Sequence, residues 1–118
     1  MRSEPLRVYC EQIDDQIVVH AVGEVDLTTA PLLDQALSQA TAAPAARWVV
    51  VNLTKVDFFG AVGLTVLLTA TSHGHATGVP VVVVTHPGQP AHRTITITEL
   101  HHKLALINSR DHALSDSR

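Results

Sequence analysis

The segment from Val49 to Leu68 has a pattern on which many phosphate-binding and nucleophilic sites are built. A β-branched run, Val49 to Val51, continues through Val56 to Gly63 into the apolar stretch Leu64 to Leu68, which predicts a strand, a loop and the start of a helix. The N–H groups of a helix N-terminus can face an anion or a partner. However, the turn from Gly60 to Gly63 contains no nucleophile, carboxylate or hydroxyl. Its side chains therefore cannot carry out chemistry.

The remaining reactive residues do not form a recognisable catalytic or metal site. Cys10 and His20 could face each other across an opening hairpin, but this pair has no third orienting group and no oxyanion loop. His73 and His75 are two residues apart, which points them to different sides of a helix, and His101 is adjacent to His102. Neither spacing matches a dedicated ligand pattern. We therefore expect no enzyme, no metal site and no cofactor.

Strands and helices alternate along most of the chain. We expect an opening hairpin of two strands that turns at Asp14-Asp15, because this turn-prone pair lies between β-branched runs. Thr28 or Thr29 can cap the first helix, which should end before Pro44. The expected strands span 6–13, 16–22, 48–53, 79–84 and 104–107, and the expected helices span about 29–43, 61–75, 91–100 and 111–114.

This order, β-β-α-β-α-β-α-β-α, predicts a single α/β domain. Its sheet should be mixed but mainly parallel, with about five strands, about four helices and an antiparallel first strand at one edge. The local pattern of one segment disagrees with the helix expected at 91–100. Thr94 to Thr98 alternates with a period of two and is β-branched throughout, which favours a strand.

Composition agrees with one globular domain. The chain has 118 residues, of which 46% are hydrophobic and 16% charged, and a net charge of −3, so it lacks the basic field that nucleic acid or an anionic membrane requires. Its longest apolar runs are shorter than the ~20 residues that a membrane helix needs. The single cysteine, Cys10, cannot form an internal disulfide and indicates a reducing compartment. We expect a cytoplasmic protein with no nucleic acid bound and no membrane insertion.

Four segments resemble the STAS domain family of anti-sigma factor antagonists. Gly23 to Pro31 is similar to the family's Gly-Glu-Leu-Asp-Leu-Ala-Thr-Ala-Pro, and Val50 to Thr54 to its Leu-Asp-Leu-Ser strand end. Residues 58–64 resemble the phosphorylation loop, an apolar pair followed by Asp-Ser-Ser-Gly-Leu, and Ile97 to Leu100 resembles Leu-Thr-Gly-Leu. The resemblance covers about residues 7–114 and implies a helix at Ala91 to Leu100.

In this alignment the residues that the family phosphorylates are absent. Gly60 replaces the aspartate, Ala61 and Val62 replace the two serines, and Asn52 replaces an aspartate at a strand end. In phosphorylatable members a kinase that is also the anti-sigma factor modifies a loop serine, and the added charge of about −1.5 to −2 changes partner binding. Here that switch has no acceptor oxygen.

The resemblance therefore implies a regulator that binds a serine-kinase-type anti-sigma factor without being controlled by loop phosphorylation. Two hydroxyls near the turn could take over as acceptors, Thr54 before it and Thr65 one helical turn after it, although helical threonines commonly bond back to a carbonyl. The expected partner-binding residues are Asp26, Thr28, Phe59, Gly60, Ala61, Val62, Gly63 and Thr65.

Other interpretations remain open. The turn can be a tolerated strand-to-helix connection in a domain that works elsewhere, and the pair Asp26 and Thr28 can serve ordinary helix capping. The chain could instead be a scaffold or accessory subunit of a signalling complex or an ABC-type transporter. It could also be a nucleotide or small-ligand sensor that uses the N–H groups of the turn. A homodimer is compatible with each of these roles.

Overall fold

The protein is described from a computed structural model, which covers residues 5–44, 46–98 and 104–108. The strands are β1 (Arg7–Ile13), β2 (Gln16–Val25), β3 (Trp48–Phe59), β4 (Val81–Thr85) and β5 (Ala105–Asn108). The helices are α1 (Ala30–Ala42), α2 (Ala61–Thr77) and α3 (Pro90–Ile97). The fourth helix, expected at 111–114, lies outside the described residues.

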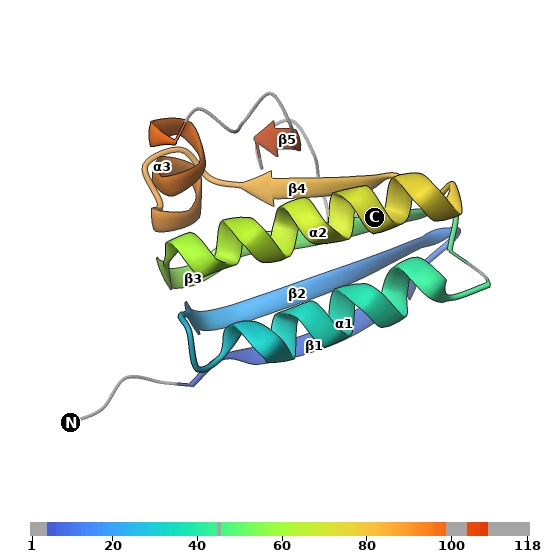
Figure 1. Cartoon of the computed structure of the whole chain (residues 1–118), viewed down its shortest axis with the longest axis horizontal. Coiled ribbons are helices and arrows are strands. Elements are labelled where there is room, and N and C mark those ends of the chain that lie inside the picture. Colours follow the sequence, from blue (N-terminus) through green and yellow to red (C-terminus); the bar gives the residue numbers. More distant parts are fainter. Residues whose placement is uncertain (1–4, 45, 99–103, 109–118) are drawn as a thin grey trace.

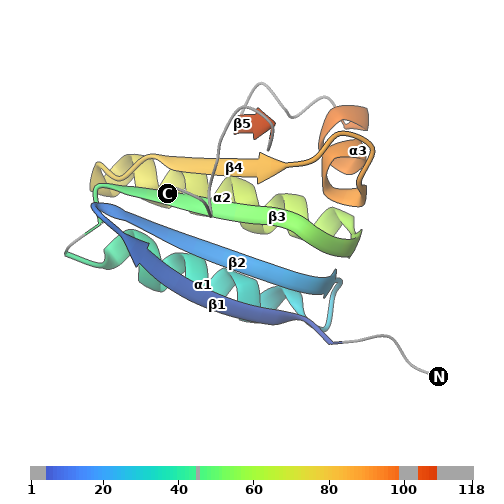
Figure 2. The ribbon, with the colours of Figure 1, turned by 180° about the vertical axis from the view of Figure 1, so that it is seen from behind.

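The strands form one mixed sheet in the order β1-β2-β3-β4-β5. β1 pairs antiparallel with β2, and the other neighbouring strands are parallel, so the expected antiparallel edge strand is confirmed. Because each crossover moves to the next strand in the same direction, right-handed connections place their helices on one face. Figure 1 shows α1 and α2 in front of the sheet, and Figure 2 shows them behind it from the opposite side. α3 lies at one end of the molecule, beyond the end of β4.

The main core lies between the sheet and the two long helices. β-branched residues of β2, β3 and β4 face Leu33 and Leu37 of α1 and Leu67 of α2, all fully buried. Side chains on successive strand positions point to opposite faces, and a smaller cluster of Val18, Val50 and Val84 occupies the other face. The near-continuous valine runs follow from this double burial.

Two boundaries differ from the sequence expectation in ways that matter for function. β3 does not end at Leu53 but continues to Phe59, because β2 also extends and pairs with it from Lys55↔Val22 to Phe59↔Val25. The expected loop between strand and helix therefore shrinks to the single residue Gly60. Thr94 to Ile97 belongs to α3, as the family resemblance implied.

Candidate partner-binding site

Gly60 forms the whole connection between β3 and α2. It is the N-cap residue of α2, with φ −81° and ψ 174°, an extended conformation that is usual for this position. Its N–H donates to the carbonyl of Val25 at the end of β2 (2.9 Å), and its own carbonyl accepts the N–H of Gly63 (2.9 Å). Ala61 is exposed and Val62 partly exposed on the first turn of α2. The two positions that the resemblance aligns with the family's serines are therefore accessible at the surface.

Phe59 and Gly63 support this turn from below. The Phe59 side chain is 3% exposed and belongs to the main core. A Cβ atom on Gly63 would lie only 2.6 Å from the Phe59 ring, so the absence of a side chain at Gly63 makes room for the ring. Of the expected partner-binding residues, these two are buried and determine where the exposed residues of the turn lie.

Asp26 organises the neighbouring connection from β2 to α1. Its carboxylate accepts the N–H groups of Thr28 and Thr29 (both 3.0 Å) and the Thr29 hydroxyl (3.1 Å). The bond from the Thr29 N–H is the largest cause that lowers the pKa of Asp26, and the Thr29 hydroxyl and Thr28 N–H add to it. Thr29 is the N-cap residue of α1, but its side chain does not cap the helix. Asp26 is thus engaged in local structure while Thr28 remains exposed.

Thr65 differs from Thr71, which lies further along the same helix. Thr71 donates its hydroxyl to the Leu67 carbonyl one turn earlier (2.9 Å), the usual behaviour of a helical threonine. Thr65 is exposed, and within the described part of the chain its hydroxyl makes no such bond. Thr54, the other flanking threonine, instead donates to Asn52 Oδ1 (2.7 Å).

Several exposed apolar side chains that were not among the expected binding residues lie at the end of the molecule that carries the Gly60 turn. Leu27 (79% exposed) follows Asp26, Phe58 (50%) precedes the buried Phe59, and Ile97 (74%) lies on α3. In Figure 1 the end of β2, the start of α2 and α3 all lie at this end of the sheet. The Thr94 hydroxyl fixes α3 here by donating to the Phe59 carbonyl (3.0 Å). The sequence contained one signal for an exposed side chain here: if Phe58 and Phe59 are neighbours on a strand, they point to opposite faces.

Within the described part of the chain, the other reactive residues do not form a second chemical site. Cys10 pairs with Val19, and His20 pairs with Tyr9, so Cys10 and His20 point to opposite faces and do not meet across the hairpin. Burial raises the pKa of the Cys10 thiol and so disfavours the thiolate. His73 Nδ1 hydrogen-bonds the Thr41 hydroxyl (2.8 Å). In the ranges that the structure describes, no three His, Cys, Asp or Glu side chains are grouped to hold a metal ion.

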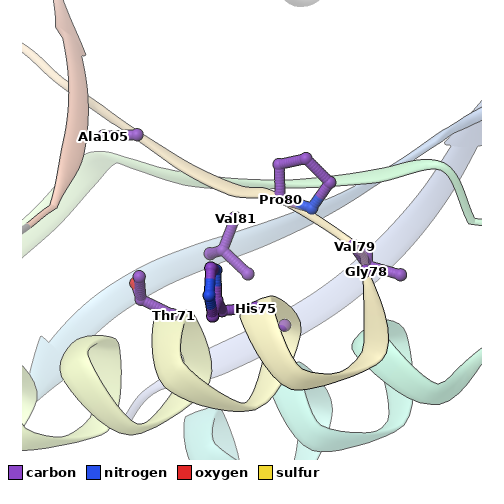
Figure 3. Close-up of a pocket in the computed structure, with 8 residues that line it drawn as sticks. Thr71, His75, Gly78, Val79, Pro80, Val81 and Ala105 are labelled. Atoms are coloured by element: carbon purple, nitrogen blue, oxygen red, sulfur yellow. The ribbon is translucent and has the colours of Figure 1, made fainter.

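A shallow groove of about 450 Å³ lies between the last turns of α2 and the start of β4. Figure 3 shows Thr71 and His75 projecting from α2 toward Val81, with Pro80 and Ala105 completing the wall. Because Gly60 is at the other end of α2, this groove is separate from the turn. Its polar side chains are few, and they are not arranged for catalysis.

Comparison with known proteins identifies the family. Residues 8–113 match the family model described as STAS domain. The chain belongs to the STAS domain family. No curated protein sequence matches this STAS domain. No helix within residues 5–44, 46–98 and 104–108 is long and apolar enough to cross a bilayer.

Solved structures similar to this STAS domain include several anti-sigma factor antagonists. The antagonist from Mycobacterium paratuberculosis is 32% identical with a TM-score of 0.76, over 86% of this chain and 84% of that one. SpoIIAA of Bacillus in its unphosphorylated form is 14% identical with a TM-score of 0.71, over 86% and 87% of the two chains. A protein of Thermotoga maritima, described as a putative antagonist, is also 14% identical, with a TM-score of 0.69 over 84% of each chain. The latter two likenesses show the fold alone.

Proposed function

We propose that this STAS domain binds an anti-sigma factor of the serine kinase type and is not switched by phosphorylation of the turn at Gly60. The observation that supports it is the exposure of Ala61 and Val62 on the first turn of α2, at the positions aligned with the family's serines. Neither residue has an oxygen that can accept phosphate. Binding would sequester the anti-sigma factor and release its sigma factor.

The surface around the turn suits protein docking. Leu27, Phe58 and Ile97 are exposed apolar side chains at one end of the fold, and aromatic and large apolar anchors contribute most of the binding energy in many interfaces. The turn itself carries no charge, so a partner can cover it without desolvating an ion. Among the expected contact residues, we assign direct contact to Thr28, Gly60, Ala61, Val62 and Thr65. Asp26, Phe59 and Gly63 hold the surface in shape.

The substitution Ala61→Glu tests this docking surface. It places a permanent charge at the centre of the proposed interface, and the partner would have to desolvate that charge. Affinity for the anti-sigma factor should fall by about 2 kcal/mol, roughly 30-fold in Kd. The fold should survive, because a helix N-terminus tolerates negative charge. Isothermal titration calorimetry with the purified anti-sigma factor measures the change.

Ser72→Glu is the matched control, since Ser72 is exposed on the same helix, away from its N-terminus. It should bind as the unmodified protein does. Equal affinity for Ala61→Glu and Ser72→Glu would move the interface elsewhere, and an absence of binding by the unmodified protein would remove the proposed partner.

A further inference from the structure

Among the residues that the structure describes, the outer edge of β1 pairs with no other strand. β1 pairs with β2 in unbroken register from Arg7↔Val22 to Ile13↔Gln16, and no described residue pairs with its other side. The strand is mostly exposed, and it contains no proline, no bulge and no lysine, three of the features that protect natural edges. Such an edge is a template for a second strand.

We propose that β1 pairs antiparallel with β1 of a second copy, about a two-fold axis at Tyr9. In this register Arg7 lies opposite Glu11 of the second copy, Tyr9 opposite Tyr9, and Val8 opposite Cys10. Each facing pair is thus of opposite charge, aromatic or apolar, which are the pairs that stabilise antiparallel strands. A strand that complements itself in this way fits a second copy of this chain better than an unrelated peptide.

The register is chosen by charge complementarity. Pairing centred on Cys10 instead would place Arg7 opposite Ile13 and Tyr9 opposite Glu11, so that neither charged residue would directly face its opposite. Centring on Tyr9 pairs both charges twice, once on each side of the axis.

Two side chains at the centre of this edge are already held in position. The Tyr9 ring stacks on the His20 ring, with centroids 4.8 Å apart and an interplanar angle of 21°. Glu11 Oε1 lies 2.9 Å from His20 Nε2. The Asn52 amide donates to His20 Nδ1 (3.0 Å), which leaves Nε2 to donate to Glu11. Because these contacts limit the motion of Tyr9 and Glu11 before association, less side-chain entropy is lost on pairing.

This dimer is independent of the proposed docking site. Strand β2 of one copy would run antiparallel to β2 of the other, so the two turns at Gly60 would lie at opposite ends of the joined sheet. Each copy could therefore bind its own partner. One strand edge covers little area, so the dimer should be weak and depend on concentration.

Disulfide trapping with Val8→Cys tests the register. Directly opposite residues have Cα atoms roughly 4.5 to 5.5 Å apart, within the disulfide range of about 4.4 to 6.8 Å. The thiol introduced by Val8→Cys should therefore bond to Cys10 of the second copy when diamide, a two-electron oxidant, accepts the two electrons and two protons that each pair of thiols loses. A non-reducing gel should show a covalent dimer.

Two matched controls share the same chemistry. In a dimer of the unmodified protein the two Cys10 residues would be diagonal neighbours, about 7 to 8 Å apart, and Val8→Cys/Cys10→Ser would have the same diagonal geometry. Both should give little covalent dimer. Equal cross-linking in all three proteins would overturn the proposed register.

Charge reversal tests the dimer without added cysteines. Sedimentation velocity of the unmodified protein should show a species of twice 12.7 kDa as concentration rises. Glu11→Arg should weaken self-association by about tenfold, and Arg7→Glu/Glu11→Arg should restore it, with circular dichroism confirming that each variant is folded. A protein that stays monomeric up to millimolar concentration would overturn the proposal. Anti-sigma factor binding should be the same in all these variants.

Discussion

At the residue scale, Phe58 and Phe59 show how two identical neighbours take different roles. Phe59 is 3% exposed and packs beneath the turn, whereas Phe58 is 50% exposed beside it. Strand geometry sends successive side chains to opposite faces, but the sequence alone does not decide which of the two faces inward. The structure shows that Gly63, which has no side chain, leaves room for the Phe59 ring.

Gly63→Ala should destabilise the fold. The new Cβ would lie 2.6 Å from the Phe59 ring, and an overpacked core typically loses about 1 to 3 kcal/mol. Alanine recovers up to about 1 kcal/mol through its helix propensity, so we expect a net loss of roughly 1 kcal/mol in the free energy of unfolding, measured by urea denaturation.

The variant Phe59→Leu, which has a smaller side chain beneath the turn, provides the control for Gly63→Ala. Phe59→Leu removes the atoms that the Cβ would meet, so adding Gly63→Ala to Phe59→Leu should cost less than adding it to the unmodified protein. If Gly63→Ala were as stable as the unmodified protein, the ring would not be what requires glycine at this position.

At the element scale, α3 forms against its own β-branched pattern. Ile95 is fully buried and Ile97 is 74% exposed, whereas in a strand these two side chains would share a face. The Thr96 and Thr98 hydroxyls bond back to the carbonyls of His92 (2.9 Å) and Thr94 (2.9 Å). Tertiary packing thus overrides the local preference, and a period-two pattern cannot reveal this without a model of the whole fold.

Thr94→Val should loosen the end of β3. The Thr94 hydroxyl donates to the Phe59 carbonyl (3.0 Å), and valine keeps the shape of the side chain but removes the donor. Loss of this bond should cost about 1 kcal/mol, with faster amide exchange near Gly60 measured by mass spectrometry.

Thr96→Val is the comparison, because the Thr96 hydroxyl bonds only to carbonyls of its own helix. It should have little effect on stability. Similar losses in both variants would show that α3 does not hold the end of β3 through Thr94.

At the scale of the whole molecule, the crossover pattern was enough to predict the domain type and the antiparallel edge strand. Alternating strands and helices with right-handed connections allow few arrangements. The length of β3 was not predictable from its local pattern, since the segment from Lys55 to Phe59 becomes strand by pairing with the extended end of β2. The candidate site was likewise predictable only in part. The family resemblance indicated the positions of Ala61 and Val62, whereas the roles of Asp26 and Leu27 became clear only from the structure.

Restoring the acceptor residues of the turn would test whether the rest of the fold still supports a phosphorylation switch. At Gly60, φ and ψ suit an aspartate N-cap, and a Cβ there would meet the exposed Phe58 ring at 3.3 Å, a side chain that can move. Gly60→Asp/Ala61→Ser/Val62→Ser should therefore fold. The variant should accept phosphate from the cognate kinase. Once phosphorylated, it should release the kinase, because the new dianion would lie where the partner needs a neutral surface.

Mass spectrometry and binding assays on this triple variant distinguish loss of the acceptor residues alone from a change in the docking surface as well. The unmodified protein is the reference and should gain no phosphate, including on Thr54 and Thr65. If only the turn has lost its acceptors, the variant should regain both modification and release. If the variant folds and binds the kinase but is not phosphorylated, the docking geometry has changed as well. A role as a scaffold or accessory subunit would then account better for a surface that binds a kinase without presenting a substrate to it.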